Sequence, residues 1–229
     1  MRKGDIRKQE ILNTAEQLFC RKGYEQTSVQ DIIDCLNSSK GSFYHHFASK
    51  EALLEGICRN RAEQIHASAS AEANTVSTVR NLDKLLSGMI PFRDEKLPFL
   101  IMLLPVFVLP EGRTVREYYC DALYGKFLPD VINQLKTGHE SGILFCEDAE
   151  NAADLILTAV NRLWVRICMM IIRTEENREE HDLSEYLRAA ESCRTIVERF
   201  LSLPYGSLTL TDIPALRRLI GQIHNHWAR

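Results

Sequence analysis

The sequence predicts an all-α protein, and three observations support this fold class. Apolar residues recur at the three- and four-residue spacing of amphipathic helices along most of the 229 residues. No segment shows the alternation of apolar and polar residues, bounded by turns, that is typical of strands. Apolar side chains make up 45% of the chain, which is enough to fill a buried core. We expect a head of three short helices at the N-terminal end, followed by a larger helical bundle.

The first predicted helix has one apolar face and a clear stop signal. Gly23 stands where a left-handed residue would end this helix, since glycine adopts positive φ at no steric cost. The apolar face consists of Ile11, Leu12, Ala15, Leu18 and Phe19.

A short second helix is predicted from a cap and a stripe. Thr27 and Gln30 have the spacing of a capping box, in which each side chain bonds the other residue's backbone N–H. The apolar residues that follow have spacings of three and four, namely Val29, Ile32, Ile33 and Leu36.

A tight turn separates this helix from a third. Asn37 tolerates positive φ, and Ser39 is a good N-cap for a helix that runs through Phe43 toward Phe47. Ser49 caps a longer fourth helix, whose apolar positions are Leu53, Leu54, Ile57, Cys58 and Ile65. Three short helices with such a turn between the second and the third predict a helix-turn-helix core.

The middle of the chain is rich in large apolar residues. The longest apolar stretch, residues 97–110, has only 14 residues, whereas a membrane span needs about 20. Because it contains Pro98, Pro105 and Pro110, we expect a broken, buried helix and no membrane partner. Pro129, Gly138 and Gly142 are the next predicted interruptions.

Two long helices are predicted near the C-terminal end. The first carries a stripe at Ala149, Ala152, Ile156, Ala159, Leu163, Ile167 and Met170. A charged linker over residues 174–181 follows, and then a capping box at Asp182 and Glu185 begins a helix with Tyr186, Ala190, Cys193, Val197 and Phe200. The pair predicts an antiparallel hairpin. Periodicity leaves open whether a second chain or the same chain covers its stripes.

Composition and charge exclude several classes of protein. The seven cysteines are scattered and form no ligand pair two residues apart, which favours reduced thiols in the cytoplasm and no metal site. We expect no signal peptide, because Met1 leads into a charged segment and not into an apolar run. We find no catalytic or cofactor fingerprint, so we expect no enzyme and no cofactor. Residues 1–50 hold eight Lys or Arg and six Asp or Glu, a charge of +2, whereas the remainder carries −5.

The head closely resembles that of the TetR/AcrR family of transcriptional regulators. Residues 27–33, 39–47 and 49–51 carry the resemblance, above all Gly41, Tyr44, His46, Phe47 and Lys50. The resemblance implies a DNA-binding domain over residues 5–65, with the helix-turn-helix at about 28–47. It implies that residues 66–229 form a helical domain for effector binding and dimerisation.

The resemblance also implies which head residues contact DNA. Ser39, Lys40 and Ser42, on the first turn of the third helix, are the expected base contacts, and Gly41 permits close approach to the DNA backbone or to a neighbouring helix. Contacts to phosphates are expected from Thr27, Ser28, Tyr44, His45 and Lys50.

Other residues near the motif have different expected roles. Arg2 and Lys3 are a candidate arm on the DNA, and Phe43 and Phe47 are expected in the core. His45 and His46 diverge by about 100° on a helix, so they are not expected to share a metal.

The function implied by the resemblance is ligand-responsive repression in the bacterial cytoplasm. A homodimer would place two third helices in successive major grooves of a palindromic double-stranded operator, about 34–36 Å apart. A small-molecule effector, bound between the fourth helix and the helices of residues 78–136, would release it. Two alternatives keep the DNA-binding head but replace the small ligand by a protein partner or by cysteine oxidation.

Overall fold

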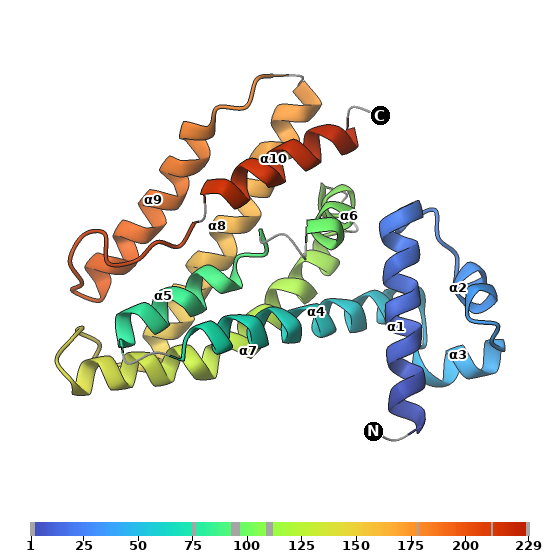
Figure 1. Cartoon of the computed structure of the whole chain (residues 1–229), viewed down its shortest axis with the longest axis horizontal. Coiled ribbons are helices and arrows are strands. Elements are labelled where there is room, and N and C mark those ends of the chain that lie inside the picture. Colours follow the sequence, from blue (N-terminus) through green and yellow to red (C-terminus); the bar gives the residue numbers. More distant parts are fainter. Residues whose placement is uncertain are drawn as a thin grey trace. The chain divides into compact units, whose positions relative to one another are not determined.

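In the computed structural model, the described residues are 3–74, 77–92, 97–108, 112–177, 179–211 and 213–227. These residues form helices and no strand, which confirms the all-α prediction (Figure 1). The helices are α1 (Lys3–Lys22), α2 (Val29–Cys35), α3 (Lys40–His46), α4 (Lys50–Glu72), α5 (Thr78–Met89), α6 (Leu97–Val108), α7 (Gly112–Glu140), α8 (Ala149–Asn177), α9 (Leu183–Phe200) and α10 (Ile213–Trp227).

The chain packs into two compact units. Unit 1 comprises Met1–Arg61 and Pro98–Tyr119, and unit 2 comprises Ala62–Leu97 and Cys120–Arg229. Helices α4 and α7 each contribute one part to each unit. The predicted domain boundary between residues 65 and 66 falls inside α4 and stays a prediction.

Helix α1 of unit 1 follows the prediction. All five residues of its expected apolar face are buried, and Gly23 has a φ of 87° directly after the last helical residue. The backbone N–H of Gly23 donates to the carbonyl of Phe19 at 2.8 Å. The left-handed glycine therefore ends this helix as expected.

The cap of α2 lies one residue later than predicted. Ser28, not Thr27, is the N-cap, and its reciprocal partner is Asp31 instead of Gln30. The Ser28 hydroxyl accepts from the Asp31 backbone N–H at 3.1 Å, and the Asp31 carboxylate accepts from the Ser28 backbone N–H at 2.8 Å. Thr27 is fully buried, and its hydroxyl donates to the carbonyl of Gly23 at 2.8 Å. Because the buried Thr27 hydroxyl is already bonded to Gly23, the Ser28 hydroxyl caps α2 instead.

The turn and the next two caps are as predicted. Asn37 has a φ of 45°, and the Ser39 hydroxyl accepts from the Ser42 backbone N–H at 3.2 Å to begin α3. Ser49 accepts in the same way from Ala52 at 3.1 Å on the first turn of α4.

A buried ion pair joins three helices of unit 1. The Arg61 guanidinium of α4 donates through Nε and Nη2 to the Glu16 carboxylate of α1. The guanidinium also lies near the Phe99 ring of α6, whose centroid is 5.7 Å from Cζ. Only 9% of the Glu16 side chain is exposed. Helix α6 is therefore part of the packing of the head.

The prediction of a broken helix over residues 97–110 was wrong, although its burial is confirmed. Residues 97–108 form one continuous helix that includes Pro98 and Pro105, and Pro110 lies outside the described residues. Pro98 stands in the first turn, where an N–H has no partner within the helix. Helix α7 likewise continues through Pro129 and Gly138, and Gly142 has a φ of 69° after it.

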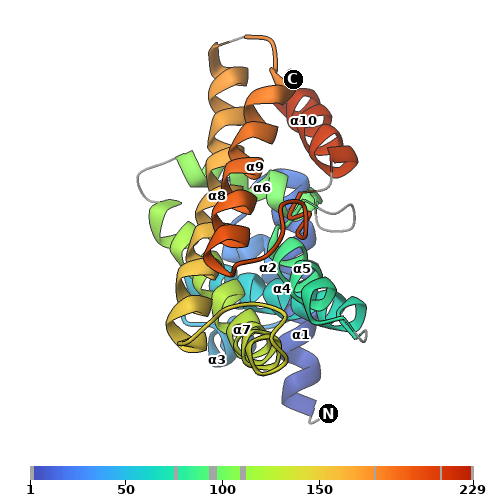
Figure 2. The same ribbon diagram turned by 90° about the vertical axis from the view of Figure 1, so that its left-hand side faces the viewer.

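In unit 2, α8 and α9 form the predicted antiparallel hairpin, and α10 packs on α8 (Figure 1 and Figure 2). The linker is shorter than expected, because α8 extends through the charged residues to Asn177. Ile171 and Ile172 remain buried there while charged neighbours face water. Helix α8 is long and apolar enough to cross a membrane, yet 56% of its apolar stretch is buried in the protein, as in an ordinary core helix.

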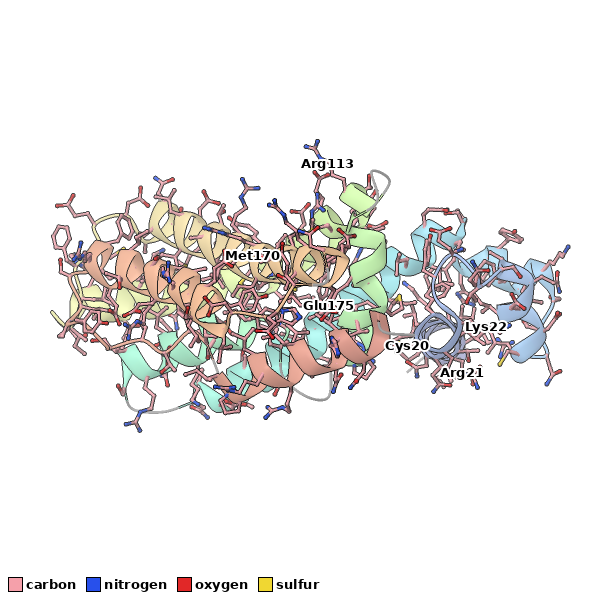
Figure 3. The ribbon with its side chains drawn as sticks, turned by 90° about the horizontal axis from the view of Figure 1, so that it is seen from above. Cys20, Arg21, Lys22, Arg113, Met170 and Glu175 are labelled. Atoms are coloured by element: carbon pink, nitrogen blue, oxygen red, sulfur yellow. The ribbon has the colours of Figure 1, made fainter. Side chains whose placement is uncertain are left out.

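Glu175 links three segments of unit 2 (Figure 3). Its Oε1 lies 2.5 Å from His181 Nε2 in the α8–α9 connection and 3.2 Å from His224 Nδ1 of α10. His181 Nδ1 in turn lies 2.8 Å from the hydroxyl of the buried Tyr186. These contacts fix the connection and α10 to the end of α8.

Candidate nucleic-acid interface

The first turn of α3 presents the four residues expected to read bases or approach DNA. Ser39, Lys40 and Gly41 are exposed, and Ser42 is half-buried. The Ser39 hydroxyl already accepts a helix N–H, which fixes where the helix begins. The surface therefore carries a lysine and two hydroxyl groups, which suit the donor and acceptor pattern of base edges.

Apolar packing beneath α3 holds that turn in place. Phe43 and Phe47 are 1% and 5% exposed, which confirms that they belong to the core. Their rings lie 6.3 Å apart, and the Phe43 ring meets the Tyr44 ring edge-on at 5.3 Å. Tyr44 is nevertheless 53% exposed, and His45 beside it is exposed as well. One side of α3 is thus fixed in the core while the other faces solvent.

Gly41 has open space around it. A Cβ added there would meet only the Ser39 hydroxyl oxygen, 4.0 Å away, within the described chain. Gly56 of α4 differs, because a Cβ there would come within 3.0 Å of the Phe47 ring. We expected Gly41 to permit close approach either to the DNA backbone or to a neighbouring helix. The described part of the chain gives no support for close packing against a helix, and close approach to DNA stays a prediction.

The candidate phosphate contacts fall into two groups. Ser28, Tyr44 and His45 are exposed, and Lys50 is half-buried with its ammonium 4.1 Å from the centroid of the Tyr24 ring. Thr27 is the exception, since its side chain is fully buried and its hydroxyl donates to the carbonyl of Gly23. Its hydroxyl therefore maintains the loop and is not presented to a ligand.

Charges around Ser28 are balanced within the chain. The Ser28 hydroxyl donates to the Asp31 carboxylate at 2.7 Å, and hydrogen bonds from Ser28 lower the pKa of Asp31 from 3.8 to about 2. Lys22 stands on the last turn of α1 (Figure 3). Its ammonium group lies 3.2 Å from the same carboxylate. The lysine offsets the negative charge at the start of α2.

A basic group on α1 was missed by the sequence analysis. Desolvation, and then electrostatic interaction with His45, Lys8 and Arg7, lower the pKa of His46. Lys8 Nζ also lies 5.9 Å from the centroid of the Phe47 ring. Helix α1 therefore brings two cations to the C-terminal end of α3. Periodicity gave no signal for this, because only packing places residues 7 and 8 beside residue 46. Arg2 lies outside the described residues, and Lys3 is the first residue of α1.

Comparison with known proteins agrees with this arrangement. The family model described as "Bacterial regulatory proteins, tetR family" matches residues 11–57. The HTH-type transcriptional regulator YerO of Bacillus subtilis is 27% identical in an alignment of 201 residues that covers 79% of this chain and 62% of YerO. The HTH-type transcriptional repressor KstR2 of Rhodococcus jostii is 33% identical over 39% of this chain and 50% of KstR2. The chain thus spans only about half to three-fifths of the length of these relatives.

Solved structures share the fold at low sequence identity. A structure described as a TetR-family transcriptional regulator from Mesorhizobium loti has a TM-score of 0.56 and 17% identity, with 87% of this chain and 98% of that chain covered. FadR of Bacillus subtilis, solved in complex with stearoyl-CoA, has a TM-score of 0.55 and 18% identity, with 85% and 97% covered. These likenesses extend the agreement in fold beyond the head.

Proposed function

Because this chain belongs to the tetR family of bacterial regulatory proteins, we propose that it is a ligand-responsive repressor that binds a specific DNA sequence. A homodimer binds a palindromic double-stranded operator in the cytoplasm, and a small-molecule effector releases it. One observation carries this proposal: the exposed polar first turn of α3 lies over a core that fixes its orientation.

The head residues take two roles in this proposal. Ser39, Lys40 and Ser42 contact base edges in the major groove, with Gly41 closest to the DNA. Ser28, Tyr44, His45 and Lys50 position the head on phosphates, and we add Arg7 and Lys8, which share the cationic surroundings of His46. Thr27 supports the loop instead of contacting DNA through its side chain.

Dimerisation is proposed for the α8–α9 hairpin. Leu155 of α8 is 59% exposed, and Ile196 and Phe200 of α9 are 65% and 48% exposed. Pairing of two hairpins into a four-helix bundle would remove these exposed apolar side chains from water. A second chain therefore explains a surface that this chain leaves uncovered.

For four of the seven cysteines, control by oxidation, the alternative to a ligand, has less support. Burial raises the pKa of Cys20 and of Cys193 to about 11, and burial also raises the pKa of Cys146 and Cys168. A raised thiol pKa leaves little of the reactive thiolate at neutral pH. If no small ligand binds, control of DNA binding by a protein partner is the alternative.

Ser70, His66 and Asp130 of unit 2 resemble a hydrolase triad in composition but not in geometry. The Ser70 hydroxyl donates to Asp130 Oδ2 at 2.9 Å, and His66 Nε2 lies 2.9 Å from the same oxygen. In a working triad the carboxylate and the serine engage opposite nitrogens of the imidazole. This arrangement favours a structural role over catalysis.

The first test is selection of sequences from a random duplex DNA library by the full-length chain at low salt. We expect a palindrome with half-sites about one helical turn apart. The affinity for that DNA should fall as salt rises, because phosphate contacts release counterions. If no sequence is enriched, the proposed function is wrong.

A glycine substitution tests the proposed docking surface. Gly41→Ala should not lower the free energy of unfolding, since open space surrounds the position and alanine favours helix. It should weaken operator binding about tenfold or more, because the methyl group stands between α3 and the DNA. Gly125→Ala in α7 is the matched control, since a Cβ there meets nothing within 4 Å, and it should leave DNA affinity unchanged. Equal DNA affinity of the two variants would remove α3 from the interface.

A further inference from the structure

A pocket of about 190 Å³ lies between α4 and α7 within unit 1. One face of α4 and the first turns of α7 line it, through Glu51, Leu54, Glu55, Cys58, Thr114, Val115 and Tyr118. The four α4 residues have the i, i+3, i+4, i+7 spacing of a single helix face. The pocket therefore lies directly against the first turns of α4.

The walls of the pocket combine an apolar floor with acidic groups. Leu54 and Cys58 are 1% and 0% exposed and form the apolar part with Val115. Glu51 and Glu55 are one helical turn apart on α4. A ligand here meets hydrocarbon and carboxylate together.

The pocket keeps a negative charge. A hydrogen bond from the Ser49 side chain lowers the pKa of Glu51, so this carboxylate is ionised at neutral pH. Arg59 pairs with Glu55 and offsets one of the two charges. None of the described residues that line the pocket is Lys, Arg or His. Arg113, on the first turn of α7, points outward (Figure 3). It pairs with Glu117 at 2.8 Å.

Tyr118 supplies an aromatic wall. It is 40% exposed and lines the same pocket as the two carboxylates. The face of an aromatic ring attracts ammonium groups, and it does so best where a carboxylate and apolar surface are also near. An anionic molecule would be repelled by the Glu51 carboxylate.

We propose that this pocket binds a small organic cation, an ammonium group on a short apolar or aromatic body, as the effector that the proposed function requires. Its volume is below the range of about 300–1,000 Å³ of drug-sized sites, so the ligand is small. The ammonium group lies toward Glu51 and Tyr118, and the apolar body lies on Leu54 and Val115.

The position of the pocket connects the ligand to the reading helix. Glu51 is the second residue of α4, and α3 ends at His46. A ligand between α4 and α7 changes how the first turn of α4 sits within unit 1, and with it the short segment that leads from α3. The ligand therefore binds the free and the operator-bound chain with different affinity.

Calorimetric titration of the full chain with three probes tests the proposal. The probes are benzyltrimethylammonium chloride, neutral 2-phenylethanol and sodium phenylacetate, which share a phenyl ring on a short arm. We expect the cation to bind at least about tenfold more tightly than the neutral probe, the anion not to bind, and the affinity for the cation to fall with added salt.

Substitutions assign the binding to this pocket. Glu51→Gln should weaken cation binding about fivefold, the effect of one partly exposed charge pair. Tyr118→Ala should weaken it several-fold, whereas Tyr118→Phe keeps the ring and should retain binding. Glu63→Gln is the matched control, since Glu63 lies on α4 outside the pocket and pairs with Lys126. The melting temperature of each variant checks that it is folded.

Two results would overturn the proposal: no heat of binding with the cation at millimolar concentration, or equal affinity of the Glu51→Gln and Glu63→Gln variants. Both are separate from failure of the proposed function. If the chain selects an operator but binds no cation, this inference fails and the DNA-binding function stands. If the cation binds at Glu51 but no DNA sequence is enriched, the pocket stands and the repressor function fails.

Discussion

The short helices of the head and the long helix α8 are held in different ways. Helices α2 and α3 have seven residues each, whereas α8 has 29. Seven residues are too few for a stable helix in isolation, so α2 and α3 depend on side-chain caps and a few buried contacts. Helix α8 buries residues at nearly every turn. Local hydrogen bonds and a few buried contacts therefore hold the reading surface together, while burial of apolar area along the whole helix holds the body.

The largest effect in this comparison is expected in α8. Ile167→Ala, at a position with 0% exposure, should lower the free energy of unfolding by about 2–5 kcal/mol, because it removes buried methyl groups and leaves a cavity. Urea denaturation measures the loss. Ile6→Ala on α1 is the matched control, since Ile6 is 46% exposed, and its effect should stay within about 0.5 kcal/mol. Similar losses in both variants would contradict the importance of burial in α8.

The Arg61–Glu16 pair should have the next largest effect, because it joins α4 to α1 through a carboxylate that is only 9% exposed. Arg61→Met removes the donors to the Glu16 carboxylate and should cost about 1.5–3 kcal/mol. The control is Arg59→Met on the same helix, whose partner is Glu55 and whose side chain is 65% exposed. It should cost less than about 1 kcal/mol. A smaller loss at Arg61 than at Arg59 would show that the head does not need this contact.

Loss of a cap should have a smaller effect on stability. Ser28→Ala removes the side-chain cap of α2, which is one of the two hydrogen bonds of its capping box, and should cost about 1 kcal/mol. Thermal or urea unfolding measures it against Ser192→Ala, an exposed serine within α9 that caps nothing and should change stability by less than about 0.5 kcal/mol. If Ser28→Ala is as mild as Ser192→Ala, caps do not hold the head.

The smallest effect is the pH dependence of the same cap. The pKa of Asp31 is about 2 in the folded chain and 3.8 ordinarily, so its contribution is present above about pH 4 and is lost as the pH falls toward 2. The difference in stability between the chain and Asp31→Asn should shrink over that interval. An NMR titration of the carboxyl group gives the pKa directly, and Ser28→Ala should raise it. A titration near 3.8 in the unmodified chain would contradict the capping bond.

Local signals in the sequence predicted the head well but misplaced one cap. Thr27 and Ser28 are both good caps, and Gln30 and Asp31 both complete a capping box, so spacing alone did not choose between them. Burial of Thr27 against Gly23 made the choice. The local signal was also misleading in the proline-rich stretch. Prolines usually interrupt helices, which predicted a broken helix, yet α6 is one continuous helix within unit 1.

The sequence by itself determined the helical class, the order of the helices, the turn at Asn37, the buried Phe43 and Phe47, and the resemblance of the head to the tetR family. Each of these depends on periodicity, caps or a motif confined to a few neighbouring residues. Only the tertiary structure decided that Arg7 and Lys8 act on His46, that α6 packs with the head through Phe99 and Arg61, and that Glu51 and Tyr118 line one pocket. Such groupings join residues dozens of positions apart, and packing free energy, which no local pattern encodes, brings them together.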